Sequence, residues 1–587
     1  MADDQTIPAK VKGAAVTFTV KVDGQAIPQT TQVYAVVVIK EANRIPSAKL
    51  TIIDGEPSKT DFAVSSGTVF LPGKEIEIFA GHQSNEDSIF KGIIVKHGIV
   101  VRKGGVSQLM LECKDKSFRM ALGRKSAYYV DQKDSDIADT LLGNHKLTIT
   151  SIEDTKKKFP EMVQYDTSDW DFLVTRMDIN GKLVLINNGA ATIKAPDFST
   201  KPVLTLQYGA TIHEFDAEMD ARNQYKAVKA ISWDQSSQEL LEINGQDPSK
   251  IKDNGNFTAA QLADVTGLKE MVLRHGGNIS QEELQSWADS YWQKSRMAKI
   301  RGRASFDGFA GVKPGDIVEL KGFGDRFNGK VLVAAIRHDL ANGGWTTSVQ
   351  FGMDPEWFAS QFIPSCPAAK SLIPDIQGLH TGVVSQLEKD PAGEDRVLIK
   401  LPMVDPGGNG TWARVATLDA GKKRGSFFRP NIGDEVLIGF IDNDPRNAVI
   451  IGMMNSSKLP AAIQPKDSNK IKGFFFSSEM EIRFNDEDPS MTFQTKGGNK
   501  LIISEKSGAE GITLQDQHGN KILMNKDGIT MESAKKMILK ASSGDIEIEG
   551  MNLKQKAQAE FKAEGAAGLE VSSSAIAKLK GSLVQIN

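Results

Sequence analysis

Residues 526–587 have the sequence KDGITMESAKKMILKASSGDIEIEGMNLKQKAQAEFKAEGAAGLEVSSSAIAKLKGSLVQIN. Pairs of core-sized residues spaced i and i+2 recur about every eight positions in this stretch, and Gly, Ser, Lys and Glu fill the intervals. Alternation with a period of two is typical of one face of a strand, and the fixed longer period indicates that each strand is one unit of a stacked array. The large residues that we expect to point inward are Ile529, Met531, Met537, Leu539, Ile546, Ile548, Leu553, Phe561, Leu569, Val571 and Leu579. The stretch therefore predicts a β-solenoid or a β-prism.

Each unit of this array offers only two inward side chains, and some of these are small (Ala563, Ala577) or polar (Gln555). A single chain would thus leave one apolar face of a long sheet open to water. Because three strands make the smallest closed prism, we predict an intertwined triple-stranded β-helix formed by a homotrimer, with Lys and Glu on its outside. A single-chain β-helix is the alternative, but its turns usually need more than eight residues.

The composition of the whole chain narrows its class. A length of 587 residues implies about three or four domains. The net charge of -3 gives no basic field that would favour nucleic acid. Cys113 and Cys366 lie far apart without a CxxC motif, so neither a disulfide framework nor a zinc site is expected. The first residues lack a signal-peptide pattern, which predicts synthesis and assembly in the cytoplasm.

The first part of the chain is patterned as strands with a few helices. Alternating apolar residues over about 14–125 predict a barrel or a curled sheet. Helices are expected near 135–143, 168–180 and 280–295, and turn-and-strand patterns beyond the last of these predict another β-rich domain.

The helix near 168–180 carries the strongest candidate for acid–base chemistry. Ser168 is placed to cap it, and Asp169 and Asp171 follow in its first turn. The two acids resemble a general acid and base, but acids in the first turn of a capped helix are more often partners of the helix dipole. We therefore expect a structural role.

A compact β domain is expected at residues 379–455, after a proline-rich linker at 366–378. Five apolar strands suit an OB-type barrel; they cover 381–384, 396–401, 411–416, 435–440 and 448–452. A basic cluster, Lys422, Lys423 and Arg424, lies beside Phe427 and Phe428 in the sequence. This combination resembles an oligonucleotide-binding face. A single basic turn is more often a solvated loop, so no nucleic acid is expected.

These motifs resemble a known family. QYDTSDWDFL, PGD, FNGK and the run from His338 to Thr347 are similar to the hub domain shared by contractile phage tails and VgrG spike proteins. The orders W-x-R-V-A, P-x-I-G-D-E-V and D-x-D-P are similar to the OB domain of the same proteins. The resemblance implies a mainly β chain with a hub domain over 1–365, in which two barrels, about 14–125 and 185–355, carry small helices. The OB-fold barrel, a connector at 456–485 and a β-helical needle at 486–587 follow.

The sequence shows no pattern for catalysis or metal binding. The eight histidines are scattered without metal-ligand spacing, and neither a GxSxG motif nor a Walker loop occurs. The short connector leaves no room for an inserted enzyme domain. His518 could help to bind an ion inside a trimeric needle, although a polar hairpin turn explains it better. We therefore expect no enzyme activity, no cofactor and no metal.

The resemblance implies the structural central spike of a contractile injection apparatus, either a type VI secretion system or an extracellular phage-tail-like particle. Expected partners are two more copies of the chain, inner tube and baseplate proteins, effector cargo, and a target membrane that is punctured mechanically. A PAAR-type tip protein is expected at Val584, Ile586 and Asn587. A trimeric receptor-binding fibre and a cell-wall-degrading spike enzyme are the alternatives.

Overall fold

The computed structural model divides the chain into two compact units. Unit one is Met1–Ile376 with Asp442–Asp444, and unit two is Gln377–Ile441 with Pro445–Asn587. The described residues are 15–234, 237–252, 254–275, 279–361, 376–404 and 407–586. Most of the predicted linker at 366–378, including Cys366, therefore lies outside the described residues, whereas Cys113 is buried and free.

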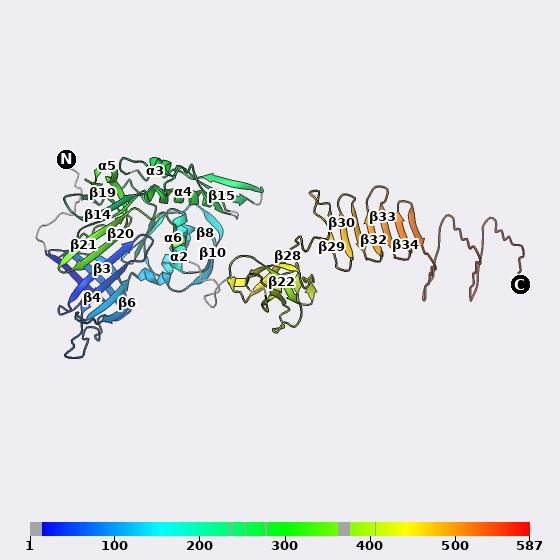
Figure 1. Ribbon diagram of the computed structural model, residues 1–587, viewed down its shortest axis with the longest axis horizontal. Coiled ribbons are helices and arrows are strands. Elements are labelled where there is room, and N and C mark those ends of the chain that lie inside the picture. Colours follow the sequence, from blue (N-terminus) through cyan, green and yellow to red (C-terminus); the bar gives the residue numbers. More distant parts are fainter. Residues whose placement is uncertain are drawn as a thin grey trace. The chain divides into compact units, whose positions relative to one another are not determined.

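A sheet of thirteen strands dominates unit one (Figure 1). Its strands are β1 (Val16–Val22), β2 (Gln25–Ala26), β3 (Val33–Glu41), β4 (Ser47–Ile53), β5 (Glu75–His82), β6 (Asn85–Val100), β7 (Gln108–Lys114), β13 (Leu204–Gln207), β14 (Ile212–Met219), β18 (Ile300–Asp307), β19 (Ile317–Lys321), β20 (Gly329–Ala341) and β21 (Gly344–Phe351). They are ordered β14-β18-β21-β20-β3-β4-β7-β6-β5-β1-β2, with β19 paired to β20 and β13 paired to β19.

Alternating side chains build the first core of this sheet. In β4, Ala48, Leu50 and Ile52 are buried, whereas the residues between them are exposed or half-buried. They pack with buried residues of β5 such as Ile76 and Ile78. A period of two thus places one face of each strand in the core, as the alternation in the sequence predicts.

The strand β20 belongs to two cores. Its residues Ala335–Ala341 pair with β3, and its residues Gly329–Leu332 pair with β19. Leu340 lies in the first core, whereas Val333 and Ile336 lie in a second core around β18, β19 and β21. Most strands of the two predicted barrels therefore form one continuous sheet with two cores.

Helices and small sheets complete unit one. The helices are η1 (Lys116–Ala121), α1 (Asp134–Asn144), α2 (Asp169–Ile179), α3 (Ala259–Thr266), α4 (Gln281–Met297), α5 (Gly324–Phe327) and α6 (Phe358–Gln361). The small sheets are β8 (Lys125–Lys133) with β10 (Lys158–Thr167); β9 (Thr148–Ile152) with β11 (Leu183–Asn187) and β12 (Ala190–Lys194); and β15 (Val228–Asp234) with β16 (Glu239–Asn244) and β17 (Met271–His275). Ser168 accepts a backbone N–H bond at the start of α2, which confirms the predicted cap, and Ser280 does the same at the start of α4. The helix α3 was not predicted, although Thr258 and Gln261 form a capping box at its start.

A buried ion-pair network joins α1, α2 and α4. Arg176 donates to both carboxylate oxygens of Asp134, at 2.9 and 3.0 Å, and to Glu283 Oε1 at 3.0 Å. Asn180 donates to the same Asp134 carboxylate at 2.8 Å. These bonds compensate the cost of burying the charges and fix the three helices against one another.

Unit one contains a buried histidine that makes folding dependent on pH. His338 on β20 is buried, and its Nδ1 lies 2.9 Å from Thr347 Oγ1. Burial, with the charge of Lys40, lowers the pKa of His338 from 6.5 to about 3. The unfolded chain therefore binds a proton near pH 6.5, whereas the folded chain binds it only near pH 3. The free energy of unfolding falls as the pH drops through this window.

We expect this histidine to cost at most about 2 kcal/mol of unfolding free energy between pH 7 and pH 5, since one pKa unit is worth about 1.4 kcal/mol. The measurement is urea unfolding at both pH values for the natural chain and for His338→Gln. The variant should lose less stability on acidification. An equal loss in both proteins would contradict the assignment.

Unit two contains the predicted five-stranded barrel. β22 (His380–Gln386), β23 (Val397–Lys400), β24 (Thr411–Val415), β28 (Ala448–Met453) and β27 (Glu435–Phe440) close in this order. Val397, Ile399, Val436 and Ile450 lie in its core. The connection between β24 and β27 carries the small hairpin of β25 (Ala420–Gly421) and β26 (Arg424–Gly425), and η3 (Ile441–Asn443) precedes β28.

An antiparallel seven-stranded sheet follows the barrel in chain order. Its strands are β29 (Ile471–Phe475), β30 (Glu481–Asn485), β31 (Ser490–Gln494), β32 (Lys500–Ser504), β33 (Gly511–Gln515), β34 (Lys521–Asn525) and β35 (Gly528–Glu532). Each strand pairs with the next one in the sequence, as the orange part of Figure 1 shows. The sheet begins at Ile471, inside the 456–485 segment that the sequence analysis treats as a connector.

Candidate functional site

Two rows of apolar side chains cross one face of the seven-stranded sheet. The first row runs from β29 to β35, whereas the second begins at β30, because Lys472 of β29 pairs with Phe484. Directly paired residues point to the same face, so the register defines the rows. The first row is Phe474, Ile482, Phe493, Leu501, Leu514, Ile522 and Met531. The second row is Phe484, Met491, Ile503, Ile512, Met524 and Ile529. We call these two rows the apolar face.

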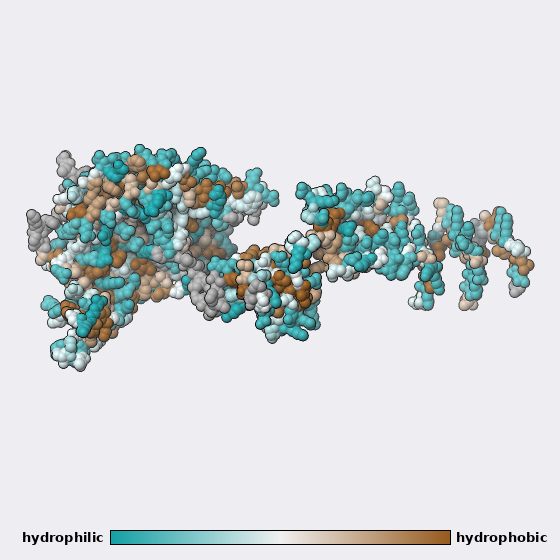
Figure 2. Space-filling view, viewed as in Figure 1, coloured by the Kyte–Doolittle hydropathy of each residue, from teal (hydrophilic) through white to brown (hydrophobic). Residues whose placement is uncertain are grey.

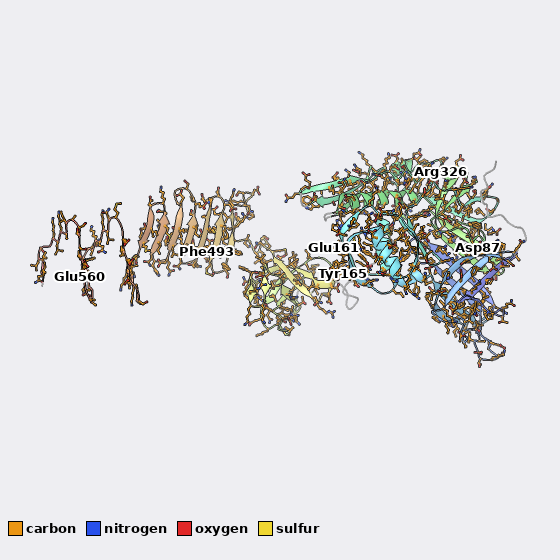
Figure 3. All side chains as sticks on the ribbon, turned by 180° about the vertical axis from the view of Figure 1, so that it is seen from behind. Asp87, Glu161, Tyr165, Arg326, Phe493 and Glu560 are labelled. Carbon is orange, nitrogen blue, oxygen red and sulfur yellow. The ribbon has the colours of Figure 1, made fainter. Side chains whose placement is uncertain are left out.

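The apolar face is open to solvent in the single chain. Leu514 is 50% exposed, Phe493 42% and Ile512 39%, and Figure 3 shows Phe493 on this sheet. The opposite face is mainly polar: the row in register between the two apolar rows holds Arg483, Thr492, Thr513 and Thr530, together with Ile502 and Leu523. A sheet with one polar face and one uncovered apolar face requires a partner, because large exposed apolar patches are unfavourable in water.

Residues 533–586 differ from the sheet that precedes them. They form no strand and no backbone–backbone hydrogen bond within the chain, among the residues that the structure describes. Figure 1 shows them as a zigzag without arrows, and Figure 2 shows apolar residues scattered along them. Apart from a few bonds to side chains, such as that from Ala534 N–H to Asn520 Oδ1, their backbone groups therefore have no hydrogen-bond partner in the described part of the chain and are available to other chains.

The predicted inward residues fall into these two regions. Ile529 and Met531 lie on the apolar face. The others lie in the strand-free segment, where each is at least 51% exposed; they are Met537, Leu539, Ile546, Ile548, Leu553, Phe561, Leu569, Val571 and Leu579. Val584 and Ile586, predicted for tip docking, are also exposed, and Asn587 lies outside the described residues. The single chain does not bring these predicted core residues together.

Of the residues on the apolar face, only Ile529 and Met531 were predicted from the sequence to point inward. The same i, i+2 pairs begin at positions 482, 491, 501, 512, 522 and 529, at intervals of 9, 10, 11, 10 and 7 residues. This uneven spacing hides the repeat from a search for a fixed period. Strands of five residues joined by turns of unequal length explain it.

The acids proposed as a catalytic alternative have structural partners. Asp169 accepts bonds from Gln164 Nε2 at 3.0 Å, and its Oδ2 lies 2.7 Å from His145 Nε2 and 2.5 Å from Lys125 Nζ. Burial raises the pKa of Asp169, but these hydrogen bonds outweigh burial and leave the pKa below its ordinary value. Asp171 accepts from the Ser168 hydroxyl at 2.7 Å. The pair thus anchors β8, β10 and the start of α2.

The other residues considered for metal or nucleic-acid binding either bond to neighbouring residues or stand alone. The described residues contain no group of His, Cys, Asp and Glu arranged to hold a metal ion. His518 lies in an exposed turn in which Asp516 accepts its backbone N–H at 2.9 Å. In the basic turn, Arg424 pairs with Asp419 at 2.8 Å, and Phe428 stacks on Phe474 with ring centroids 5.3 Å apart.

Three family models match successive parts of the chain. A family model described as the Alg8 N-terminal domain matches residues 12–342, which is more than half of the chain. The chain belongs to this family. The type VI secretion system/phage-baseplate injector OB domain matches residues 380–454, and the phage baseplate V C-terminal trimerisation domain matches residues 490–587. The chain is thus a homologue of VgrG-type spike proteins, and most of its apolar face lies in the part matched by a trimerisation domain.

Individual proteins resemble the chain more distantly. The type VI secretion system spike protein VgrG1b of Pseudomonas aeruginosa is 22% identical over 398 residues, which cover 62% of this chain and 50% of VgrG1b. The chain thus spans half the length of this curated relative. A tail protein from Neisseria meningitidis has a TM-score of 0.43 at 16% identity, with 58% of this chain and 98% of that chain covered. A type VI secretion component of E. coli has a TM-score of 0.36 at 12% identity, with 74% and 99% covered.

Among the described residues, no helix is both long enough and apolar enough to span a membrane.

Proposed function

We propose that three copies of this chain form the central spike of a contractile injection apparatus. The observation that carries the proposal is the apolar face: from β30 to β35 every position of its two rows is apolar, yet the chain itself leaves it uncovered. Three such faces turned toward a common axis would exclude water from all of them, while the polar face of each sheet stays in solvent.

The segment 533–586 fits the same assembly. Its regular apolar residues need a core, and most of its backbone groups need partners that the described part of the chain does not supply. Strands wound around two other copies satisfy both needs at once and leave no free sheet edge. This segment is then the needle, in which neighbouring chains share hydrogen bonds along the whole length.

The work of such a spike is mechanical. Contraction of a sheath supplies the energy, and the needle concentrates the force on a small area of the target membrane. Unit one docks on the inner tube and the baseplate, and a PAAR-type tip protein binds at Val584, Ile586 and Asn587. Effector cargo travels with the tip or in the tube. The spike is assembled in the cytoplasm, is delivered outside the cell and catalyses no reaction.

The test compares the solution mass of the full chain with that of a chain truncated after Ser456. We expect the full chain at about three times 63.9 kDa by light scattering, and the truncated chain at the mass of one copy, because the truncation removes the apolar face and the needle. The five-stranded barrel remains intact in the truncated chain and serves as its folding control. A full chain that stays monomeric at micromolar concentration would overturn the proposal.

A further inference from the structure

Unit one has a hollow of about 670 Å³ that lies apart from the apolar face. The loop after β14, the helix α4, the start of β18 and residues 354–360 form its walls. Its volume lies in the range of sites that bind small molecules or peptide side chains, about 300–1,000 Å³.

Three aromatic rings follow one another along this hollow. The ring centroids of Tyr225 and Tyr291 are 5.8 Å apart, and those of Tyr291 and Trp357 are 5.9 Å apart. The Lys294 ammonium lies 4.7 Å from the centre of the Trp357 ring, so the chain itself already uses this ring to hold a cation. Electron-rich ring faces of this kind attract positive charge.

The cations in the wall are already neutralised. Arg222 donates to Asp220 through Nε at 3.0 Å and through Nη2 at 2.7 Å, and these bonds lower the pKa of Asp220 to about 2. Arg301 Nη2 lies 2.9 Å from Glu218 and 3.8 Å from Asp220. Two arginines thus face two acids, and their charges balance.

Two exposed carboxylates in the wall form no direct ion pair among the described residues. Asp354 Oδ1 accepts the backbone N–H of Glu356 at 3.0 Å. Lys294 is paired with Asp178 at 2.7 Å and donates to the Glu356 carbonyl. Burial lowers the pKa of Lys294, and the charge of Asp354 is among those that oppose this shift. The hollow therefore combines aromatic faces with two exposed carboxylates that have no direct ion-pair partner.

We propose that this hollow binds the arginine side chain of a basic segment in a partner protein. A guanidinium group stacks flat on aromatic rings and donates paired hydrogen bonds to a carboxylate, which an ammonium group does less well. The ring of Tyr291 stacks on the plane of the group, the Trp357 ring, tilted by 45° to it, closes one side, and Asp354 and Glu356 accept the N–H bonds. The space beyond one side chain accommodates the neighbouring residues of the segment. The inference is independent of how the copies of the chain assemble.

The test measures the binding of acetyl-Gly-Arg-Gly-amide to the full chain by calorimetry. We expect a dissociation constant on the order of 1 mM, which is the scale for a single small contact. The same peptide with citrulline, which keeps the shape of arginine but lacks its charge, should bind at least tenfold more weakly. Equal binding of the two peptides would overturn the proposal.

A pair of variants locates the site. Asp354→Asn with Glu356→Gln should weaken binding of the arginine peptide at least tenfold. Glu86→Gln with Asp87→Asn changes the net charge equally at the start of β6, where Figure 3 labels Asp87, and should leave binding unchanged. Equal loss in both pairs would show a general charge effect and reject the site. Tighter binding of spermidine than of the peptide would reject a protein partner in favour of a free polyamine.

Discussion

The double variant Leu501→Asp with Leu514→Asp is expected to be a monomer with a mass near 63.9 kDa. The two leucines face each other across β32 and β33, in the first row of the apolar face. In a trimer, the variant would bury six carboxylates around one axis without partners, and each would cost several kcal/mol. Assembly would then be less favourable than exposure of the whole face.

A matched variant on the other face of the same sheet supplies the control. Thr492→Asp with Thr513→Asp adds the same charges to β31 and β33, but at positions between the apolar rows. This protein should remain a trimer in light scattering, because its carboxylates stay in water. Circular dichroism should show less strand in the monomeric variant than in this control, because residues 533–586 form strands only in the assembled needle. A trimeric Leu501→Asp, Leu514→Asp protein would mean that the apolar face is not the contact between copies.

The largest loss of stability in unit one is expected from Asp134→Ala. Arg176 is 12% exposed at its side chain and would keep Glu283 as its remaining acidic partner after the substitution. Removal of one member of a buried pair costs roughly 3–5 kcal/mol, and we expect a loss on this scale because Glu283, which is 23% exposed, compensates the Arg176 charge only in part. Guanidinium unfolding followed by tryptophan fluorescence measures this loss.

Two further proteins separate the buried charge from the loss of a contact. Glu56→Ala removes a partner of Lys59 in an exposed pair, 54% and 70% exposed, and should cost less than about 1 kcal/mol. Asp134→Leu combined with Arg176→Met replaces the main ion pair with apolar groups and should recover much of the loss. If Asp134→Ala were as stable as Glu56→Ala, the network would not hold the helices together.

The five-stranded barrel shows what periodicity in a sequence can predict. The segments expected at 381–384 and 435–440 became β22 and β27, because short apolar runs between turns have few other solutions. Closure was not predictable in the same way. It depends on a parallel pairing of Arg414 and Val415 with β28, which joins strands that are far apart in the sequence.

The candidate site was only partly predictable for a related reason. The fixed eight-residue period drew attention to residues after Lys526, whereas the seven-stranded sheet has turns of uneven length and no fixed period. The carboxylates and rings of the hollow in unit one, such as Tyr225, Tyr291 and Asp354, come from separate parts of the chain. No local pattern links such residues, because only the tertiary fold brings them together.

The strand β20 has a consequence for how unit one comes apart. It supplies Leu340 to one core and Val333 to the other, and it is hydrogen-bonded to β3, β19 and β21. If either half of unit one unfolded, β20 would separate from the other half, and the core of that other half would also be exposed. The two halves therefore unfold as one cooperative element, with a single heat-absorption peak in calorimetry, although each has a hydrophobic core of its own.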